Sequence, residues 1–242
     1  MKASVSDQRS VLDIQKFDLQ SATLRNRAAT LPELAEITTT TIKQNNVRDL
    51  RIAAETEMSD VKRELARAEG DVEQIVTRIT RDETRLASGT GSAKELEQTQ
   101  HELGTLGARR AELEEIELEI MMTVDGIKDR ITSLVDEENQ LSLVIAELNI
   151  RKENALAAIH TELEGIESDR KATTQSVGAE ILALYEKIRE SSNGIGAAAL
   201  AGNQCKGCNL TMNTIELARI AGLSEDEVVR CEECRCILIR GN

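Results

Sequence analysis

Apolar residues recur every seven positions along two long stretches of this chain. In the first stretch, two such series run from Val47 to Ile75 and from Met58 to Leu86. In the second stretch, they run from Leu106 to Ala155 and from Leu96 to Ile166. Paired series at this spacing are the inner positions of a coiled coil, and so narrow an apolar seam needs a partner helix. The pattern predicts long helices packed against one another.

A short break, Ser88-Gly89-Thr90-Gly91-Ser92, separates the two stretches. Glycine tolerates the positive φ at which helices stop, and Ser92 followed by Glu95 is typical of a capping box that starts a helix. We therefore expect the chain to fold back here, with residues 33–87 paired against residues 93–147. A parallel dimer through the same heptads is the alternative, and the glycine turn favours the hairpin.

The single proline, Pro32, marks a second break near residues 30–32. Proline loses no hydrogen bond at the first position of a helix, and Thr30 is suited to cap a helix that starts there. We expect Val5–Ala29 to lie along the far part of the second long helix, which should run from Ala93 to about Glu190. The predicted fold class is an all-α elongated antiparallel coiled-coil hairpin over residues 1–192, followed by a small C-terminal β zinc ribbon over residues 193–242.

Composition agrees with long helices and not with a compact core. Phe17 and Tyr185 are the only aromatic residues, and 30% of the chain is charged. The formal net charge of -13 opposes non-specific binding to nucleic acid or anionic membranes. Because no apolar run approaches the length of a membrane span, we expect a cytoplasmic protein that binds no membrane.

The sequence contains none of the usual catalytic motifs. His101 and His160 lie far apart on helical sequence without a neighbouring nucleophile, and no glycine-rich phosphate loop or HExxH sequence occurs. We therefore expect surface roles for both histidines and no enzymatic activity.

Five cysteines lie within the last 40 residues, and four of them form two CxxC pairs, Cys205 with Cys208 and Cys231 with Cys234. In a reducing cytoplasm such pairs are typical of metal ligands, and two pairs complete the four thiolates of a tetrahedral zinc site. We predict one structural zinc ion per chain. Rubredoxin-type iron is the rival metal, and a redox-active CxxC pair is a weaker alternative.

Short β-compatible runs around the cysteines predict a ribbon of a few strands. They lie at Ile195–Leu200, Val228–Arg230 and Ile237–Arg240, with a short helix over Met212–Ile220 after Asn213. Because so small a domain buries little apolar surface, metal binding is expected to supply much of its folding free energy.

Cys236 is left over once the four ligands are assigned. Three interpretations stay open for it: a spare thiol on the strand after the second pair, an alternative metal ligand, or a reactive thiol beside the positively charged Arg235.

The whole chain resembles the bacterial family that joins a long coiled-coil hairpin to a C-terminal C4-type zinc ribbon. Besides the four cysteines, the resemblance rests on short sequences at the helix restart, along the second long helix and before the ribbon: Lys94-Glu95-Leu96-Glu97, Gln100-His101-Glu102-Leu103, Leu113-Glu114-Glu115, Glu119-Ile120-Met121 and Tyr185-Glu186-Lys187-Ile188-Arg189. The start, with Val11-Leu12-Asp13-Ile14-Gln15 and the Leu31-Pro32 break, resembles actinobacterial members most. The closing segment differs from the family pattern, which has Gly and Arg where this chain has Arg235 and Cys236.

Among the members of the family that this chain resembles are regulators tied to an alternative sigma factor, flagellar gene expression and transcript binding, while many others have no assigned role. We therefore weigh a zinc-binding adaptor or scaffold for protein partners, with a role in gene regulation, against a nucleic-acid-binding regulator that acts through the ribbon. From Ile195 onward, five positive charges stand against six negative ones, and no aromatic side chain is available for base stacking. Charge thus favours the adaptor over binding of RNA or DNA. A thiol enzyme that uses Cys236 is the third hypothesis, and we expect a monomer or a weak dimer.

Overall fold

A computed structural model describes residues 1–241 of the protein. Its elements follow in the order α1 (Val5–Ala29), α2 (Pro32–Ala87), α3 (Ala93–Gln175), α4 (Ala179–Ser191), β1 (Ala197–Ala201), β2 (Gln204–Cys205), α5 (Thr214–Ala221), β3 (Val229–Arg230) and β4 (Ile237–Ile239). The chain forms two compact units, which we call the hairpin unit (Ala35–Asn149) and the ribbon unit (Met1–Leu34 with Ile150–Asn242). The strands and cysteines thus share one unit with α1, α4 and the last part of α3.

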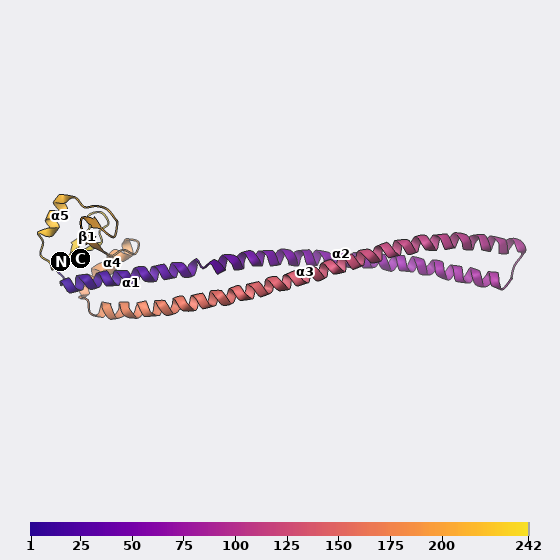
Figure 1. The fold of residues 1–242 in the computed structure, drawn as a ribbon, viewed down its shortest axis with the longest axis horizontal. Coiled ribbons are helices and arrows are strands. Elements are labelled where there is room, and N and C mark those ends of the chain that lie inside the picture. The colour runs from indigo at the N-terminus through magenta and orange to yellow at the C-terminus, as the bar shows by residue number, and fades with distance from the viewer. Residues whose placement is uncertain (242) are drawn as a thin grey trace. The chain divides into compact units, whose positions relative to one another are not determined.

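The hairpin unit consists of two antiparallel helices, most of α2 and the first part of α3 (Figure 1). The apolar positions predicted to form the seam are buried or half-buried, with Ala54 at 1% exposure and Leu113 at 8%. Between the helices, Arg51 Nε lies 2.9 Å from Glu138 Oε2. The predicted coiled-coil hairpin is confirmed.

The predicted turn between these helices is also confirmed. Gly89 and Gly91 both have positive φ, 64° and 140°. Glu95 Oε2 accepts hydrogen bonds from the backbone N–H and the hydroxyl of Ser92 at 2.7 and 2.9 Å, and Ser92 Oγ accepts the N–H of Glu95 at 3.4 Å. This reciprocal pair is the predicted capping box.

The break near Pro32 is present, but Thr30 closes the helix before it instead of capping the helix after it. The N–H of Thr30 donates to the carbonyls of Asn26 and Arg27 at 3.0 and 3.3 Å, and its hydroxyl donates to Asn26 at 2.8 Å. A threonine hydroxyl can bond backward to the preceding turn as readily as forward to the next one. The capping role predicted for Thr30 is therefore wrong, and Pro32 itself begins α2.

The expected continuous helix from Ala93 to Glu190 is also wrong, because α3 ends at Gln175 and α4 begins at Ala179. Before the break, the hydroxyls of Thr173 and Thr174 donate to backbone carbonyls of their own helix at 2.9 and 2.8 Å. Gly178 then serves as the N-cap residue of α4. Two adjacent β-branched residues followed by a glycine favour such a break.

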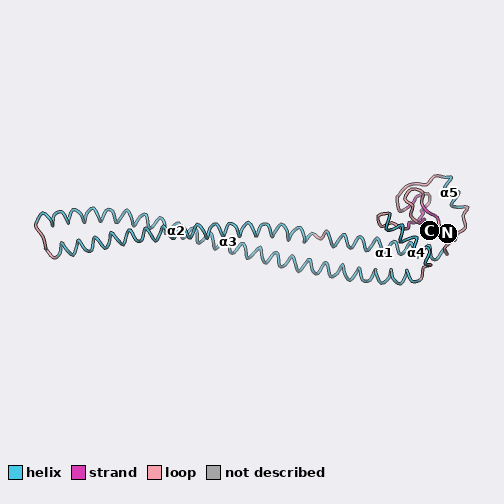
Figure 2. The backbone as a smooth tube through the Cα atoms, turned by 180° about the vertical axis from the view of Figure 1, so that it is seen from behind, coloured by secondary structure: helices cyan, strands magenta, loops and turns pink. Residues whose placement is uncertain are grey.

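In the ribbon unit, α1 and α4 enclose a core with one face of the sheet. Val11, Ile14, Ile181, Tyr185 and Ile237 form its centre, and none is more than 1% exposed. The sheet has the strand order β2-β1-β4-β3, in which β1 and β4 are parallel and the other two pairs are antiparallel. Figure 2 shows the strands gathered beside the start of α1, with both chain ends next to them. The prediction of a small C-terminal strand region is confirmed.

Asp18 connects the three helices of the ribbon unit. Its carboxylate accepts hydrogen bonds from Arg170 of α3 at 2.7 and 3.1 Å and from the Tyr185 hydroxyl of α4 at 2.6 Å. Burial opposes ionisation of Asp18, but these bonds and the nearby Arg189 outweigh it and lower the pKa of Asp18. Burial and the contact with Asp18 raise the pKa of Tyr185, so the phenol keeps the proton that it donates.

Replacing Asp18 with Asn should cost about 2 kcal/mol of unfolding free energy at neutral pH, because Arg170 loses a charged acceptor. The Asp18 side chain is only 12% exposed, so water replaces that acceptor poorly. Because the pKa of Asp18 is lower in the folded chain, its contribution is complete above the unfolded pKa of about 4 and is lost as the pH falls through the folded value. Urea unfolding at neutral pH and at about pH 3 measures this difference.

The matched control is Asp13→Asn. Asp13 forms an exposed pair with Lys16 at 2.7 Å, so this change should alter stability by less than about 0.5 kcal/mol at either pH. A cost of Asp18→Asn that stayed constant under acid conditions would show that the carboxylate charge is not its source.

Candidate metal centre

Each cysteine pair lies on a tight turn next to a strand. Cys205 is the last residue of β2, and Cys231 directly follows β3. In both turns, a backbone N–H four residues later donates to the carbonyl of the first cysteine, from Asn209 at 2.8 Å and from Arg235 at 3.0 Å. Asn209 and Arg235 also share a positive φ, 61° and 62°. The two CxxC turns therefore have the same backbone geometry.

The structure brings together all four predicted metal ligands, Cys205, Cys208, Cys231 and Cys234. Their Sγ atoms lie within 4.8 Å of one another, and the Cys205–Cys234 and Cys208–Cys231 sulfurs are both 3.9 Å apart. Four sulfurs at about 2.3 Å from a tetrahedrally coordinated zinc ion are about 3.8 Å apart. The donor set and its spacing fit a metal ion, so these four cysteines can hold one.

The four thiols of this group are shielded from solvent to different degrees. Cys205 and Cys231 are buried, and Cys208 and Cys234 are half-buried. Burial raises the pKa of the Cys234 thiol to about 12. A divalent cation favours the thiolate at such a position because the thiolate is its ligand.

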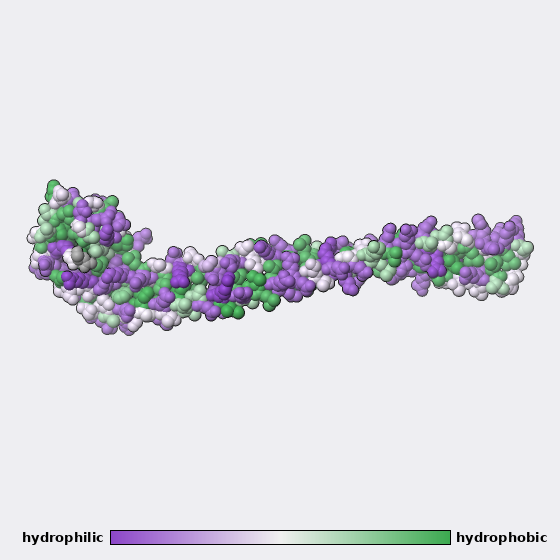
Figure 3. Space-filling model, viewed as in Figure 1, coloured by the Kyte–Doolittle hydropathy of each residue, from purple (hydrophilic) through white to green (hydrophobic). Residues whose placement is uncertain are grey.

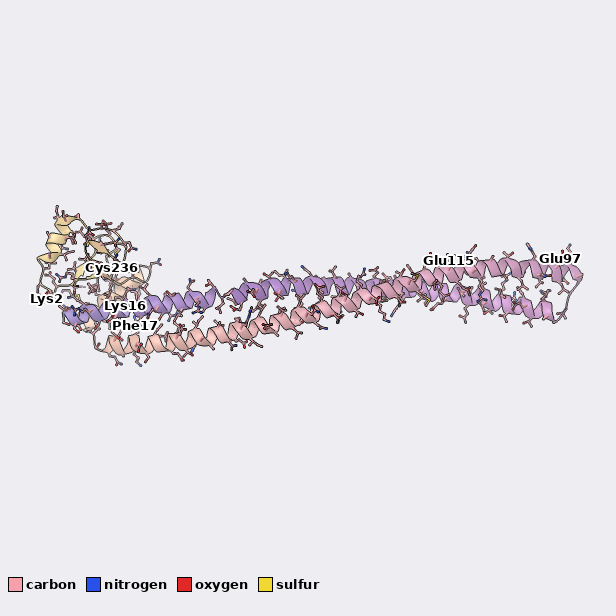
Figure 4. All side chains as sticks on the ribbon, viewed as in Figure 1. Lys2, Lys16, Phe17, Glu97, Glu115 and Cys236 are labelled. Carbon is pink, nitrogen blue, oxygen red and sulfur yellow. The ribbon has the colours of Figure 1, made fainter. Side chains whose placement is uncertain are left out.

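Cys236 lies beside these four thiols, within the ribbon (Figure 4). It is fully buried, and its Sγ is 3.3 Å from that of Cys234 and 3.8 Å from that of Cys205. Burial raises the pKa of the Cys236 thiol, which disfavours the thiolate that a reactive cysteine needs. The geometry therefore agrees with a spare core thiol or an alternative ligand, and it disagrees with a reactive thiol.

Gln15 fixes the ribbon to α1, a role that the sequence analysis missed. Its Oε1 accepts the N–H groups of Gly196 and Ala197 at 2.6 and 3.1 Å, and its Nε2 donates to the carbonyl of Gly194 at 2.9 Å. The side chain is 3% exposed. Its position next to Ile14, on the apolar face of α1, is the signal that could have identified it.

Two further side chains hold the loop between α5 and β3. Arg240 donates to five backbone carbonyls within residues 220–227, at 2.7 to 3.3 Å. The side chain of Gln8 in α1 donates to a backbone carbonyl of the same loop at 2.9 Å. The backbone N–H of Ala3 donates to the carbonyl of Asp226 at 2.8 Å. The loop that precedes β3 and Cys231 is thus tied to the first residues of the chain.

Replacing Arg235 with Gly should stabilise the second CxxC turn by about 1 kcal/mol, because a residue with a Cβ is strained at this φ and glycine is not. Slower hydrogen exchange of the Ile237–Ile239 amides would report the gain. Arg235→Ala is the control, since it removes the long side chain but keeps the Cβ. An equal gain in both variants would assign the effect to the arginine side chain and refute the argument from strain.

The two histidines lie on the surface of α3, as expected. His101 is exposed, and His160 Nδ1 lies 3.4 Å from Glu164 in an exposed pair. Within residues 1–241, the four cysteines are the one group of His, Cys, Asp or Glu side chains whose spacing suits a metal ion. In the same part of the chain, no helix combines the length and the apolar character needed to cross a membrane.

Comparison with known proteins places the chain in a family. Residues 14–193 match the CT398-like coiled coil hairpin domain. The uncharacterized protein Rv2229c of Mycobacterium tuberculosis is 34% identical over 244 residues, which cover 99% of this chain and 98% of the relative. The uncharacterized protein ML1638 of Mycobacterium leprae is 26% identical, with 93% and 96% covered.

Solved structures agree with this assignment. A structure from Mycobacterium smegmatis matches with a TM-score of 0.87 at 30% identity and covers 100% of both chains. CT398 from Chlamydia trachomatis has the same fold, with a TM-score of 0.67 at 19% identity and with 97% and 98% covered. From its sequence and its fold, this chain belongs to the family of CT398-like coiled coil hairpin domains.

Proposed function

We propose that this protein is a zinc-binding coiled-coil adaptor, which holds one structural zinc ion in its ribbon and binds protein partners. The observation that carries the proposal is the cluster of four cysteine sulfurs, with two 3.9 Å separations that match tetrahedral coordination by zinc. Soft thiolate ligands favour zinc over magnesium or calcium. All four positions are taken by protein ligands, which is typical of a structural site and not of a catalytic one.

Exposed apolar side chains on the hairpin unit support binding to proteins. Leu118, Met121 and Met122 are 58%, 46% and 69% exposed, and their spacing places them on one face of α3. Figure 3 shows apolar side chains at the surface of the helices. Methionine is enriched in protein interfaces because its flexible side chain adapts to varied partners.

The protein is proposed to have no catalytic activity of its own. Lowered carboxylate pKa values can mark catalytic groups, but in this chain each of them has a structural cause. These carboxylates accept hydrogen bonds from nearby arginine, lysine, tyrosine or serine groups: Asp18 from Arg170 and Tyr185, Glu95 from Ser92, Glu216 from Arg219, and Asp226 from Ser224 and Lys2.

Affinity capture from the native cell extract tests the proposal, after elemental analysis has shown one zinc ion per chain. The intact protein should recover a protein partner that survives nuclease treatment. The double variant Cys231→Ser and Cys234→Ser should lose both the zinc and any partner that contacts the ribbon. Glu233→Ser, in the same turn but without a ligand, is the matched control and should keep both.

A second pair of variants tests the apolar surface. Leu118→Ser with Met122→Ser should reduce partner recovery, whereas Glu119→Ser with Thr123→Ser should leave it unchanged, because that pair lies on the same helix at the same spacing but removes no apolar side chain. If recovery of the partner depended on RNA or DNA, the nucleic-acid-binding regulator would replace the adaptor as the proposed function. A chain without bound zinc would refute the metal assignment.

A further inference from the structure

A pocket of about 390 Å³ lies where α1, α3 and α4 of the ribbon unit meet, and we call it the junction pocket. Four cationic side chains and two carboxylates line it: Arg25, Arg170, Lys171, Arg189, Asp18 and Glu167. Its volume falls within the range of roughly 300 to 1,000 Å³ that is usual for small-molecule sites. All of these residues belong to the ribbon unit, as do the cysteines.

Arg170 and Arg189 are held in place by carboxylates, and each keeps N–H groups that these carboxylates do not use. Arg170 uses its Nε and Nη2 for Asp18 and its Nη2 for Glu186, and Arg189 uses its Nε and Nη2 for Glu186. Within residues 1–241, the Nη1 group of neither arginine makes a hydrogen bond or an ion pair. Each therefore offers two fixed N–H donors, so binding a ligand would cost little side-chain entropy.

Ser21 adds a neutral donor to the same pocket. The residue is 5% exposed and lines the pocket. Its hydroxyl makes no hydrogen bond within residues 1–241, and its oxygen is reached by solvent, since Glu33 Oε2 is the one fully buried polar side-chain atom without a partner in this part of the chain. An oxygen atom of a ligand in the pocket would replace that solvent as the acceptor of the hydroxyl.

The two remaining cations are free to move toward a ligand. Lys171 is exposed and has no ion-pair partner among the described residues. Arg25 lies 3.1 Å from Glu167, in a pair whose side chains are 64% and 59% exposed and which is therefore weak. The four cations outnumber Asp18, Glu167 and Glu186 by one charge, on a chain whose formal net charge is -13.

We propose that the junction pocket binds a small molecule that carries a pyrophosphate or a similar group of adjacent phosphate charges. Fixed guanidinium donors match the geometry of phosphate oxygens, and several cations suit a ligand with more than one negative charge. The volume leaves room for an organic group beside the phosphates. The acidic remainder of the chain repels an extended polyanion, which favours a small ligand over nucleic acid.

Calorimetric titration of the full-length protein with inorganic pyrophosphate tests the proposal. We expect saturable binding with a Kd below about 1 mM, and weaker binding of inorganic orthophosphate, which carries less charge. Lys171→Gln should weaken pyrophosphate binding by about tenfold, because it removes a mobile cation. Ser21→Ala should weaken it by about threefold to tenfold through the loss of one neutral donor.

Lys187→Gln is the matched control. Lys187 is exposed on α4 and does not line the pocket, but its replacement changes the net charge by the same amount. This variant should bind pyrophosphate like the intact protein. Equal weakening by Lys187→Gln and Lys171→Gln would overturn the proposal by showing only general attraction to charge, as would the absence of saturable binding. Binding of a short RNA that pyrophosphate fails to displace would likewise overturn the choice of a small ligand.

Discussion

Removal of the metal should unfold the ribbon while the hairpin unit stays folded. Structural zinc contributes on the order of 10 kcal/mol to the folding of comparable small domains. Here β2 and β3 have two residues each and β4 has three, so the strands alone provide few hydrogen bonds. After treatment with a chelator, the amides of β1 to β4 should exchange rapidly in hydrogen-exchange mass spectrometry. The double variant Cys231→Ser and Cys234→Ser should give the same result.

The amides of α2 and of the first part of α3 provide the internal reference, because they form a separate compact unit. Their exchange should be unchanged, and the far-UV circular dichroism should remain strongly helical. Cys236→Ser is the control for the ligand set and should retain one zinc ion and a protected ribbon. Loss of zinc from this variant would identify Cys236 as a ligand, and protection that persists without metal would contradict the dependence of the ribbon on zinc.

The hairpin and the cysteine group could be predicted because each rests on a local or strictly periodic signal. A seven-residue repeat places every seam residue on one helical face, whatever lies elsewhere in the chain. Gly89, Gly91 and the Ser92–Glu95 pair encode the turn within a few residues. Likewise, a two-residue gap lets each cysteine pair bind one ion from a single turn.

The rest depends on contacts between distant residues, which a single sequence does not reveal. Gln15 meets Gly196 across 181 positions, and Asp18 meets Arg170 across 152. The neighbouring Ile14 places Gln15 on the apolar face of α1, but the local sequence does not show that its amide bonds the backbone of residues 194–197. The end of α3 was missed for another reason: Thr173 and Thr174 favour a break only weakly, since threonine is tolerated inside many helices, and the packing of α4 against α1 is a long-range contact.

Gly196→Ala should destabilise the ribbon unit by about 3 kcal/mol, because the added methyl group has no space. A Cβ at this position would lie 2.6 Å from two ring carbons of Tyr185 and 2.8 Å from its backbone oxygen. Tyr185 cannot move aside easily, since it is fully buried and its hydroxyl is bonded to Asp18. Nor can the backbone shift freely, because the N–H of Gly196 donates to Gln15 and its carbonyl accepts from Ile237. Urea unfolding followed by hydrogen exchange in α4 and β1 would measure the loss.

Gly126→Ala tests whether the effect comes from crowding and not from the loss of glycine itself. A Cβ on Gly126 meets nothing within 4 Å, so alanine should stabilise α3 by about 1 kcal/mol. A double-mutant cycle of Gly196→Ala with Tyr185→Ala then separates the clash with the Tyr185 ring from the clash with its backbone oxygen. Without the ring, the added methyl group at position 196 still meets the backbone oxygen, so its cost should fall but not vanish. A cost of Gly196→Ala that is the same with and without the Tyr185 ring would mean that the ring is not what excludes a side chain at position 196.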